Sequence, residues 1–239
     1  MPAAAIKKNN SMKYLFLLFA IFFSVPVFAQ QITYEQWQAE AKTEINLQPE
    51  YGNAPKNEGQ KQADRDFIKI ALKSDTTPLK ASEHLVSLGF TYLYRGDLET
   101  AMRRFNQAWL LDPKNENAYW GYGAIYASFN DYKMALDMYE KGLAINPKSS
   151  NILTDKATMY MVSFEKNQNV DDLKTATEIF KQSYIIDRTN QNTLFKLSIC
   201  YFFSNDCTNA MKYYNECKKL GGKPITSDYT NALMAKCNK

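Results

Sequence analysis

Four cysteines carry the clearest chemistry in this chain, and all of them lie within its last 40 residues: Cys200, Cys207, Cys217 and Cys237. An even, clustered set is typical of disulfide bonds when a chain is exported to an oxidising compartment. Zinc is the competing interpretation, but the sequence has no CxxC pair and its only histidine, His84, is far from the cluster. We therefore predict disulfides, with three pairings open to four cysteines.

Residues that support catalysis or ligand chemistry are otherwise sparse. Gly121 and Gly123 fall in a helical stretch without the lysine of a phosphate loop. His84 is expected on a solvated helix surface, where it would not form a Ser-His-Asp triad. Asp171 and Asp172 could offer oxygens to Ca²⁺, but the surrounding segment lacks the glycine and the terminal glutamate of an EF-hand. The sequence therefore predicts a non-enzymatic protein without a cofactor or metal.

The N-terminal segment has the layout of a targeting sequence. Three lysines precede an uncharged run over residues 14–29, which ends in the small-residue cleavage pattern Val27–Phe28–Ala29. A membrane anchor is the alternative, but a spanning helix needs roughly 20 apolar residues, and this run is shorter and contains a proline. The residue directly after the predicted cleavage site is Gln30 rather than cysteine, which argues against a bacterial lipid anchor. We predict that 1–29 is a cleaved signal peptide and that the protein is exported to the periplasm or secreted, without stable membrane insertion.

The charge balance gives no indication of a nucleic-acid partner. The formal net charge is +4, from 29 basic and 25 acidic residues. Three of the lysines and none of the acids lie in residues 1–29, so cleavage leaves 26 basic and 25 acidic residues. Nucleic-acid binding usually requires a clustered basic face. We therefore predict protein or peptide partners and no nucleic acid.

A motif of small, large and helix-ending residues recurs after 34 positions. Small residues allow two helices to approach closely, large ones fill the space between them, and proline ends the second helix. The first copy is Leu85, Leu88, Gly89, Tyr92, Ala101, Phe105, Ala108 and Pro113, and the second is Tyr119, Tyr122, Gly123, Tyr126, Ala135, Tyr139, Gly142 and Pro147. The pattern predicts stacked pairs of antiparallel helices.

This motif resembles the tetratricopeptide repeat family, in an exported protein of bacterial type, strongly over about 82–237 and weakly over 31–76. The resemblance implies an all-α fold, a right-handed α-solenoid of antiparallel helix pairs. The expected organisation is a degenerate N-terminal helical pair (30–76), four repeats within 77–224 (about 82–115, 116–149, 150–190 with an insertion, and 191–224) and a C-terminal capping helix (225–239).

Two regions depart from a regular repeat. Before the first repeat, we expect a helix over 32–46, a loop over 47–61 rich in Pro and Gly, and a helix over 63–74. In the third repeat, seven extra residues around 163–172 indicate either a longer helix or an inserted loop. Such insertions are often functional.

The antiparallel packing of the last helices favours one disulfide. A turn near residue 223 places Cys207 opposite the end of the capping helix, close to Cys237. Cys200–Cys237 is the competing pair. A bridge at this point would hold a terminal helix and contribute about 2–4 kcal/mol.

In the tetratricopeptide family, the first helix of each repeat lines the concave face. The matching positions here are mainly apolar and aromatic, which is typical of an interaction surface, with asparagines at one edge that could bond a peptide backbone. The predicted groove residues are Phe90, Tyr94, Asn117, Trp120, Asn151, Asn192, Phe195, Ile199, Phe202 and Phe203. The Lys/Asn/Arg set with which chaperone-binding members hold a C-terminal carboxylate is absent from these positions.

The sequence thus favours an adaptor that holds a peptide or protein segment in an apolar concave groove outside the cytoplasm. Three alternatives stay open at this point. The face could be covered by the helix over 32–46 or by a second copy of the chain. The protein could be an assembly subunit of an envelope or secretion complex, or a self-associating array. A hydrolase site in the inserted segment is the remaining enzymatic hypothesis.

Overall fold

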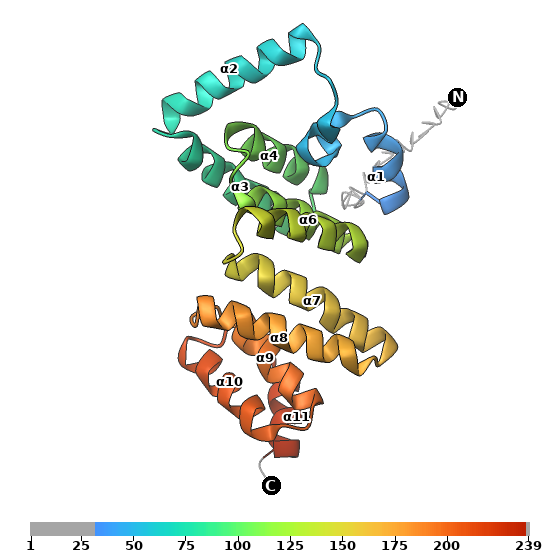
Figure 1. The fold of residues 1–239 in the computed structure, drawn as a ribbon, viewed down its shortest axis with the longest axis vertical. Helices are drawn as coiled ribbons and strands as arrows, with labels where there is room; N and C mark the ends of the chain where they lie inside the picture. The colour runs from blue at the N-terminus through green and yellow to red at the C-terminus, as the bar shows by residue number, and fades with distance from the viewer. Residues whose placement is uncertain (1–31, 238–239) are drawn as a thin grey trace, which may run out of the picture. The chain divides into compact units, whose positions relative to one another are not determined.

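The computed structural model describes residues 32–237, and the predicted signal peptide lies outside this range. The described chain is all-α, as predicted (Figure 1). Its elements are α1 (Tyr34–Ala41), the 3-10 turns η1 (Ile45–Leu47) and η2 (Pro49–Asn53), α2 (Glu58–Ser74), α3 (Pro78–Tyr94), α4 (Leu98–Leu111), α5 (Glu116–Ser128), α6 (Tyr132–Ile145), α7 (Ser150–Asn167), α8 (Val170–Ile186), α9 (Gln191–Phe203), α10 (Cys207–Lys219) and α11 (Ser227–Cys237). Every helix within residues 32–237 is too short or too polar to cross a bilayer.

The helices from α3 onward stack as antiparallel pairs. α3 packs on α4, α5 on α6, α7 on α8 and α9 on α10, and the second helix of each of the first three pairs also contacts the first helix of the next. The first helices, α3, α5, α7 and α9, contact one another in turn. We call the surface formed by these first helices the A face, and the surface formed by α4, α6, α8 and α10 the B face.

The turns within three of the four helix pairs share one backbone conformation and one type of N-cap residue. The residue before each N-cap aspartate has a left-handed backbone: Gly96 (φ 80°), Asn130 (φ 62°) and Asn205 (φ 60°). Glycine and asparagine adopt this conformation most readily. The aspartates that follow accept hydrogen bonds from backbone N–H groups in the first turns of α4, α6 and α10. These local signals explain why the boundaries of the paired helices follow from the sequence.

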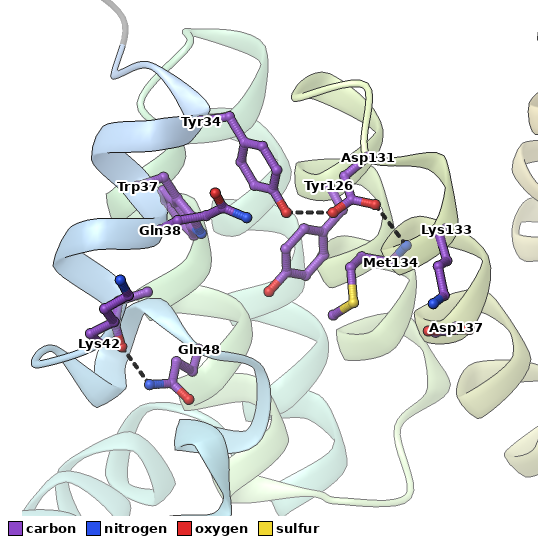
Figure 2. Close-up of a pocket in the computed structure, with 11 residues that line it drawn as sticks. Tyr34, Trp37, Gln38, Lys42, Gln48, Tyr126, Asp131, Lys133, Met134 and Asp137 are labelled. Carbon is purple, nitrogen blue, oxygen red and sulfur yellow. Dashed lines mark hydrogen bonds between the residues drawn. The ribbon is translucent and has the colours of Figure 1, made fainter.

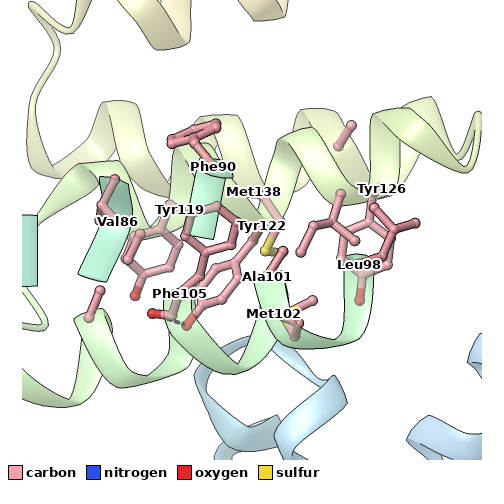
Figure 3. Packing of buried hydrophobic residues seen from close by; sticks show 14 of the residues in the cluster. Val86, Phe90, Leu98, Ala101, Met102, Phe105, Tyr119, Tyr122, Tyr126 and Met138 are labelled. Atoms are coloured by element: carbon pink, nitrogen blue, oxygen red, sulfur yellow. Dashed lines mark hydrogen bonds between the residues drawn. The ribbon is translucent and has the colours of Figure 1, made fainter. Parts of the chain in front are cut away.

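Glycines at the helix crossings allow the helix pairs to pack closely around one aromatic ring. Phe105 of α4 is fully buried between Gly89 of α3 and Gly121 of α5, and a Cβ atom at either glycine would overlap its ring. Phe90 and Tyr122 contact the same ring edge-on, with centroids 5.2 and 6.3 Å away (Figure 3). Phe90 of the A face is therefore packed directly against the buried Phe105 ring.

The extra residues of the third repeat lengthen both of its helices. α7 continues to Asn167 and α8 begins at Val170, so the connection is only Gln168 and Asn169. Gln168 ends α7 in a left-handed conformation (φ 55°), and the Ser163 hydroxyl donates to Asp172 across the hairpin at 2.6 Å. Of the two alternatives, the helix extension is the one observed.

The N-terminal residues differ most from expectation. The helix predicted over 32–46 ends at Ala41, with η1 at the end of the predicted range, and the loop predicted over 47–61 contains η2 and the start of α2. α2 begins earlier than predicted because Asn57 and Gln60 form a capping box. The helices predicted to pair within 30–76 also lie against different neighbours. α1 packs on η1 and on the turn between α5 and α6, whereas α2 packs on α3.

Residues 45–53, which we call the strap, join α1 to the B face through one buried amide. Asn106 of α4 donates to the carbonyl oxygens of Asn46 and Gln48, both at 2.9 Å, and accepts from the backbone N–H of Tyr51 and from the Tyr122 hydroxyl at 3.4 and 2.7 Å. Asn106 is fully buried. Buried polar groups require such partners, so the strap is specified by hydrogen bonds as well as by apolar packing.

Glu50 of the strap holds an ionised network against α5 and α6. Its carboxylate accepts from the Tyr119 hydroxyl and from Lys141 Nζ, the latter at 2.7 Å. Burial opposes ionisation of Glu50, but these hydrogen bonds and the charge of Lys141 outweigh it and hold the pKa of this carboxyl below its usual value. The ionised form therefore stabilises the folded state above the unfolded-state pKa, and this contribution is lost as the pH falls through the lower, folded-state pKa.

We expect this contribution to appear as a pH-dependent difference between wild type and Glu50→Gln. At about pH 7 the variant should be less stable by roughly 1–2 kcal/mol, because a charge-assisted network is replaced by neutral hydrogen bonds. The difference should shrink on acidification towards about pH 3. Urea unfolding across this range measures it. A difference that stays constant with pH would show that the charge of Glu50 contributes nothing.

The predicted Cys207–Cys237 disulfide is present, with a sequence separation of 30 and a Cα–Cα distance of 5.3 Å. It ties the start of α10 to the end of α11. The competing Cys200–Cys237 pair is not formed, and Cys200 and Cys217 are buried free thiols. Burial raises the pKa of Cys200 to about 12. Because the thiolate is the reactive form, Cys200 is an inert core residue.

Candidate functional site

A pocket of about 480 Å³ opens on the A face between three successive first helices. We call it the A-face pocket. It brings together five of the ten predicted groove residues, Phe90, Tyr94, Asn117, Trp120 and Asn151. Its other lining residues are Glu83, Val86, Ser87 and Thr91, all from α3. One face of α3, from Glu83 to Tyr94, lies beside the first turns of α5 and α7, which brings these side chains together.

Three aromatic rings form the wall of this pocket. Phe90 and Trp120 are in contact, with centroids 4.2 Å apart, and Tyr94 lies 6.1 Å from Phe90. Phe90 is only 9% exposed, whereas Tyr94 is 78% exposed. The Trp120 indole N–H donates to Asp155 at 2.6 Å, which fixes the indole in place. The pocket thus combines two anchored rings with one ring that is available to a partner.

The Asp155 carboxylate lies next to the A-face pocket, on the side of the Trp120 indole N–H. It lies on α7 one helical turn after Asn151. Burial raises the pKa of Asp155, while the positive charge of Lys196 and the hydrogen bond from Trp120 oppose that rise. Burial likewise lowers the pKa of Lys196, against the attraction of Asp155, and Lys196 Nζ donates to the Thr158 hydroxyl at 2.6 Å. These opposite charges lie in poorly solvated surroundings, where their fields act strongly.

The other five predicted groove residues lie elsewhere, at the C-terminal end of the A face. Phe195 and Phe202 pack edge-on against Tyr229 of α11, with centroids 5.4 and 5.8 Å away, and Lys236 lies over the Phe202 ring. Phe203, 43% exposed, packs on Phe164 at the tip of α7. Ile199 packs against the core of the third and fourth repeats, and Asn192 is exposed. The capping helix therefore uses rings that the sequence assigned to a ligand.

Of the alternatives left open by the sequence, covering of the A face by residues 32–46 is not the one observed. Tyr34 and Trp37 of α1 pack against Phe129, with centroids 5.0 and 5.2 Å away, and the strap lies on α4. The first contact places α1 at the turn between α5 and α6, and the second places the strap on the B face. Within residues 32–237, the A-face pocket is therefore open.

Sequence reasoning missed a second, larger pocket, of about 720 Å³, between α1 and α6 (Figure 2). The Tyr34 hydroxyl donates to Asp131, which also caps α6 through the backbone N–H of Met134. Burial and the contact with Asp131 raise the pKa of Tyr34 to about 12. The polar groups at its centre thus already serve to attach α1 to α6. The remaining lining residues are Trp37, Gln38, Ala41, Lys42, Gln48, Tyr126, Lys133 and Asp137.

Comparison of the sequence with known families agrees with the observed repeats. Residues 92–161 match the family model described as tetratricopeptide repeat. A curated relative, Tetratricopeptide repeat protein 6 of Homo sapiens, is 30% identical over 90 residues. That match covers 38% of this chain and 16% of the human protein, so the chain spans only a small part of the relative.

Two solved structures share the fold. A thermophilic TPR protein of Thermus thermophilus superposes with a TM-score of 0.53 at 14% identity, covering 64% of this chain and 80% of the other. Yeast Tom70 superposes with a TM-score of 0.53 at 16% identity, covering 86% of this chain and 39% of Tom70. Identities this low concern the arrangement of paired helices alone. The comparisons thus show tetratricopeptide repeats over residues 92–161 and the same arrangement of paired helices over a larger part of the chain.

Proposed function

We propose that the A-face pocket binds a peptide or protein segment, and that the chain is a non-enzymatic adaptor. Tetratricopeptide repeats are protein–protein interaction scaffolds, which present a concave surface built from successive repeats. One observation carries the proposal to this site: an open pocket in which Tyr94 is exposed beside the fixed rings of Phe90 and Trp120. Tyrosine and tryptophan are among the residues most often found as interface anchors.

The pocket also has groups suited to a peptide backbone. Asn117 and Asn151 lie on its lining at matching positions of two successive repeats. An asparagine side chain both donates and accepts hydrogen bonds, as a peptide group does. A bound segment would therefore have its backbone held by the two amides and one side chain held by the aromatic wall.

Substitution of Tyr94 tests this proposal. We expect Tyr94→Ala to weaken binding of a selected peptide at least tenfold, about 1.4 kcal/mol, while the melting temperature stays within about 1–2 °C, since the ring is exposed. The matched control is Ile185→Ala, because Ile185 is 72% exposed but lies on α8, outside the pocket. Peptides selected from a random display library on the folded protein, with Kd measured by fluorescence anisotropy, provide the readout. Equal Kd values for wild type and Tyr94→Ala would place the binding surface elsewhere.

We further propose that the protein acts outside the cytoplasm, in the periplasm or as a secreted protein. The lysine-led apolar run before Gln30 and the Cys207–Cys237 bridge support this location. N-terminal sequencing of the protein recovered from cell envelope and medium tests it. We expect a chain that starts at Gln30 and has two alkylatable thiols after unfolding. An uncleaved chain with four free thiols in the cytosol would contradict the proposed location.

A further inference from the structure

The charged lining of the A-face pocket is acidic. Its lining includes Glu83 and no lysine or arginine. Glu83 is exposed and has no hydrogen-bond or ion-pair partner within residues 32–237. Asp155 adds a second carboxylate, held against the Trp120 indole at 2.6 Å. A partner group placed in this pocket would therefore face an unpaired negative charge on one side and a fixed carboxylate behind one wall.

The aromatic wall favours the same sign of ligand. The faces of Phe90, Tyr94 and Trp120 carry partial negative charge, which attracts an ammonium or guanidinium group. Asp155 already occupies the N–H of Trp120, so the indole offers a ligand its ring rather than a donor. The wall therefore suits a cation with an aliphatic stem better than it suits a carboxylate.

The positive charge of Lys196 opposes the negative charge of Asp155. Lys196 of α9 attracts Asp155 and bonds to Thr158, but it does not line the pocket. It offsets part of the Asp155 charge and none of the unpaired charge of Glu83. The field of Asp155 still reaches the pocket, because it raises the pKa of Tyr94 in addition to the rise caused by burial.

We propose that the A-face pocket selects a lysine or arginine side chain of the bound segment. The cationic head would lie against the rings of Phe90 and Trp120, and the carboxylates of Glu83 and Asp155 would attract it at longer range. This inference rests on the proposed peptide-binding function and specifies the chemistry of the partner.

Peptides that differ at one position test the inference. Four synthetic libraries with a fixed central arginine, lysine, norleucine or glutamate, and random flanks, are titrated into protein purified after expression of the full chain. Norleucine is the control because it keeps the aliphatic stem without the charge. We expect the arginine and lysine libraries to bind about tenfold more tightly than norleucine at low salt, and glutamate to bind more weakly than norleucine. The advantage of the cations should shrink as salt is added.

A double variant that removes both negative charges tests whether the preference for cations arises in the pocket. Glu83→Gln with Asp155→Asn removes both charges, and the new amide oxygen at 155 can still accept from Trp120. This variant should lose the tenfold preference for arginine and keep its affinity for norleucine. Glu178→Gln is the matched control, because Glu178 pairs with Lys181 on α8, away from the pocket.

The outcomes separate the two proposals. Equal binding of arginine and norleucine libraries, together with loss of both in Tyr94→Ala, would overturn the cation preference and leave the peptide-binding function standing. Preference for glutamate would also overturn it. Absence of binding by all four libraries would overturn both the preference and the proposed function.

Discussion

Replacement of Phe105 by alanine is expected to lower the free energy of unfolding by about 4 kcal/mol, because the cavity it leaves cannot collapse. The ring is fully buried and lies between Gly89 and Gly121, which have no side chains to move into the space. Urea denaturation followed by circular dichroism measures the change. Phe203→Ala is the control, since Phe203 is 43% exposed, and it should cost less than about 1 kcal/mol.

The same packing predicts a reversal of sign at Gly121. In the wild-type background, Gly121→Ala should destabilise by about 1–3 kcal/mol, because the new methyl group would overlap the Phe105 ring. In the Phe105→Ala background, the same change should stabilise by about 1 kcal/mol, because alanine has the higher helix propensity and fills part of the cavity. The four proteins form a double-mutant cycle. Additive effects would show that Gly121 is not required by close contact with Phe105.

Replacement of Asn106 by alanine is expected to cost about 3–5 kcal/mol and to release the strap. The buried amide makes four hydrogen bonds, three of them to the strap residues Asn46, Gln48 and Tyr51. A buried group that loses its partner costs about 1–3 kcal/mol, so several such losses add up. Chemical denaturation measures the stability, and limited proteolysis under native conditions should show early cleavage between α1 and α2.

The neighbouring Gln107→Ala is the matched control for this variant. Gln107 lies on the same helix, and its side chain accepts a hydrogen bond from Arg104, three residues earlier on that helix. Loss of this local contact should change stability by less than about 0.5 kcal/mol. If Asn106→Ala left the protease sensitivity of the strap unchanged, apolar contacts such as the buried Leu47 would be what holds it.

The paired helices were predictable because their determinants are local. The small residues at the crossing points, the left-handed Gly96 and Asn130 before each N-cap aspartate, and the 34-residue spacing all lie within one repeat or between adjacent ones. The Cys207–Cys237 bridge followed for the same reason, since its ends belong to two consecutive helices. Patterns of this kind specify the fold without long-range information.

The packing positions of α1 and the strap were not predictable in this way. The place of α1 depends on contacts such as that of Trp37 with Phe129, which lies far away in sequence. The strap contains four successive residues, from Glu50 to Asn53, with positive φ, and only one of them is glycine. Non-glycine residues rarely adopt this conformation, and the buried partners of the strap, rather than its own sequence, impose it.

The candidate site was likewise predictable only in part. The position rule that identified Phe90, Tyr94 and Trp120 treats every repeat alike, so it selected Phe195 and Phe202 as well. The final repeat, however, is followed by α11, whose Tyr229 covers both rings. A position that faces a ligand in the middle of an array thus becomes core at its end.

The central claim is that a peptide segment binds in the A-face pocket, and the three tryptophans of the chain allow a direct test. Trp120 lines that pocket, Trp37 lines the pocket beside α1, and Trp109 donates its indole N–H to Tyr119 near the strap. The measurement is a titration of ¹⁵N-labelled protein with the tightest selected peptide, in which the three indole N–H resonances are followed. We predict that the Trp120 resonance shifts in proportion to saturation while those of Trp37 and Trp109 stay in place. A shift of Trp37 with Trp120 unchanged would place the peptide in the pocket beside α1 and contradict the claim.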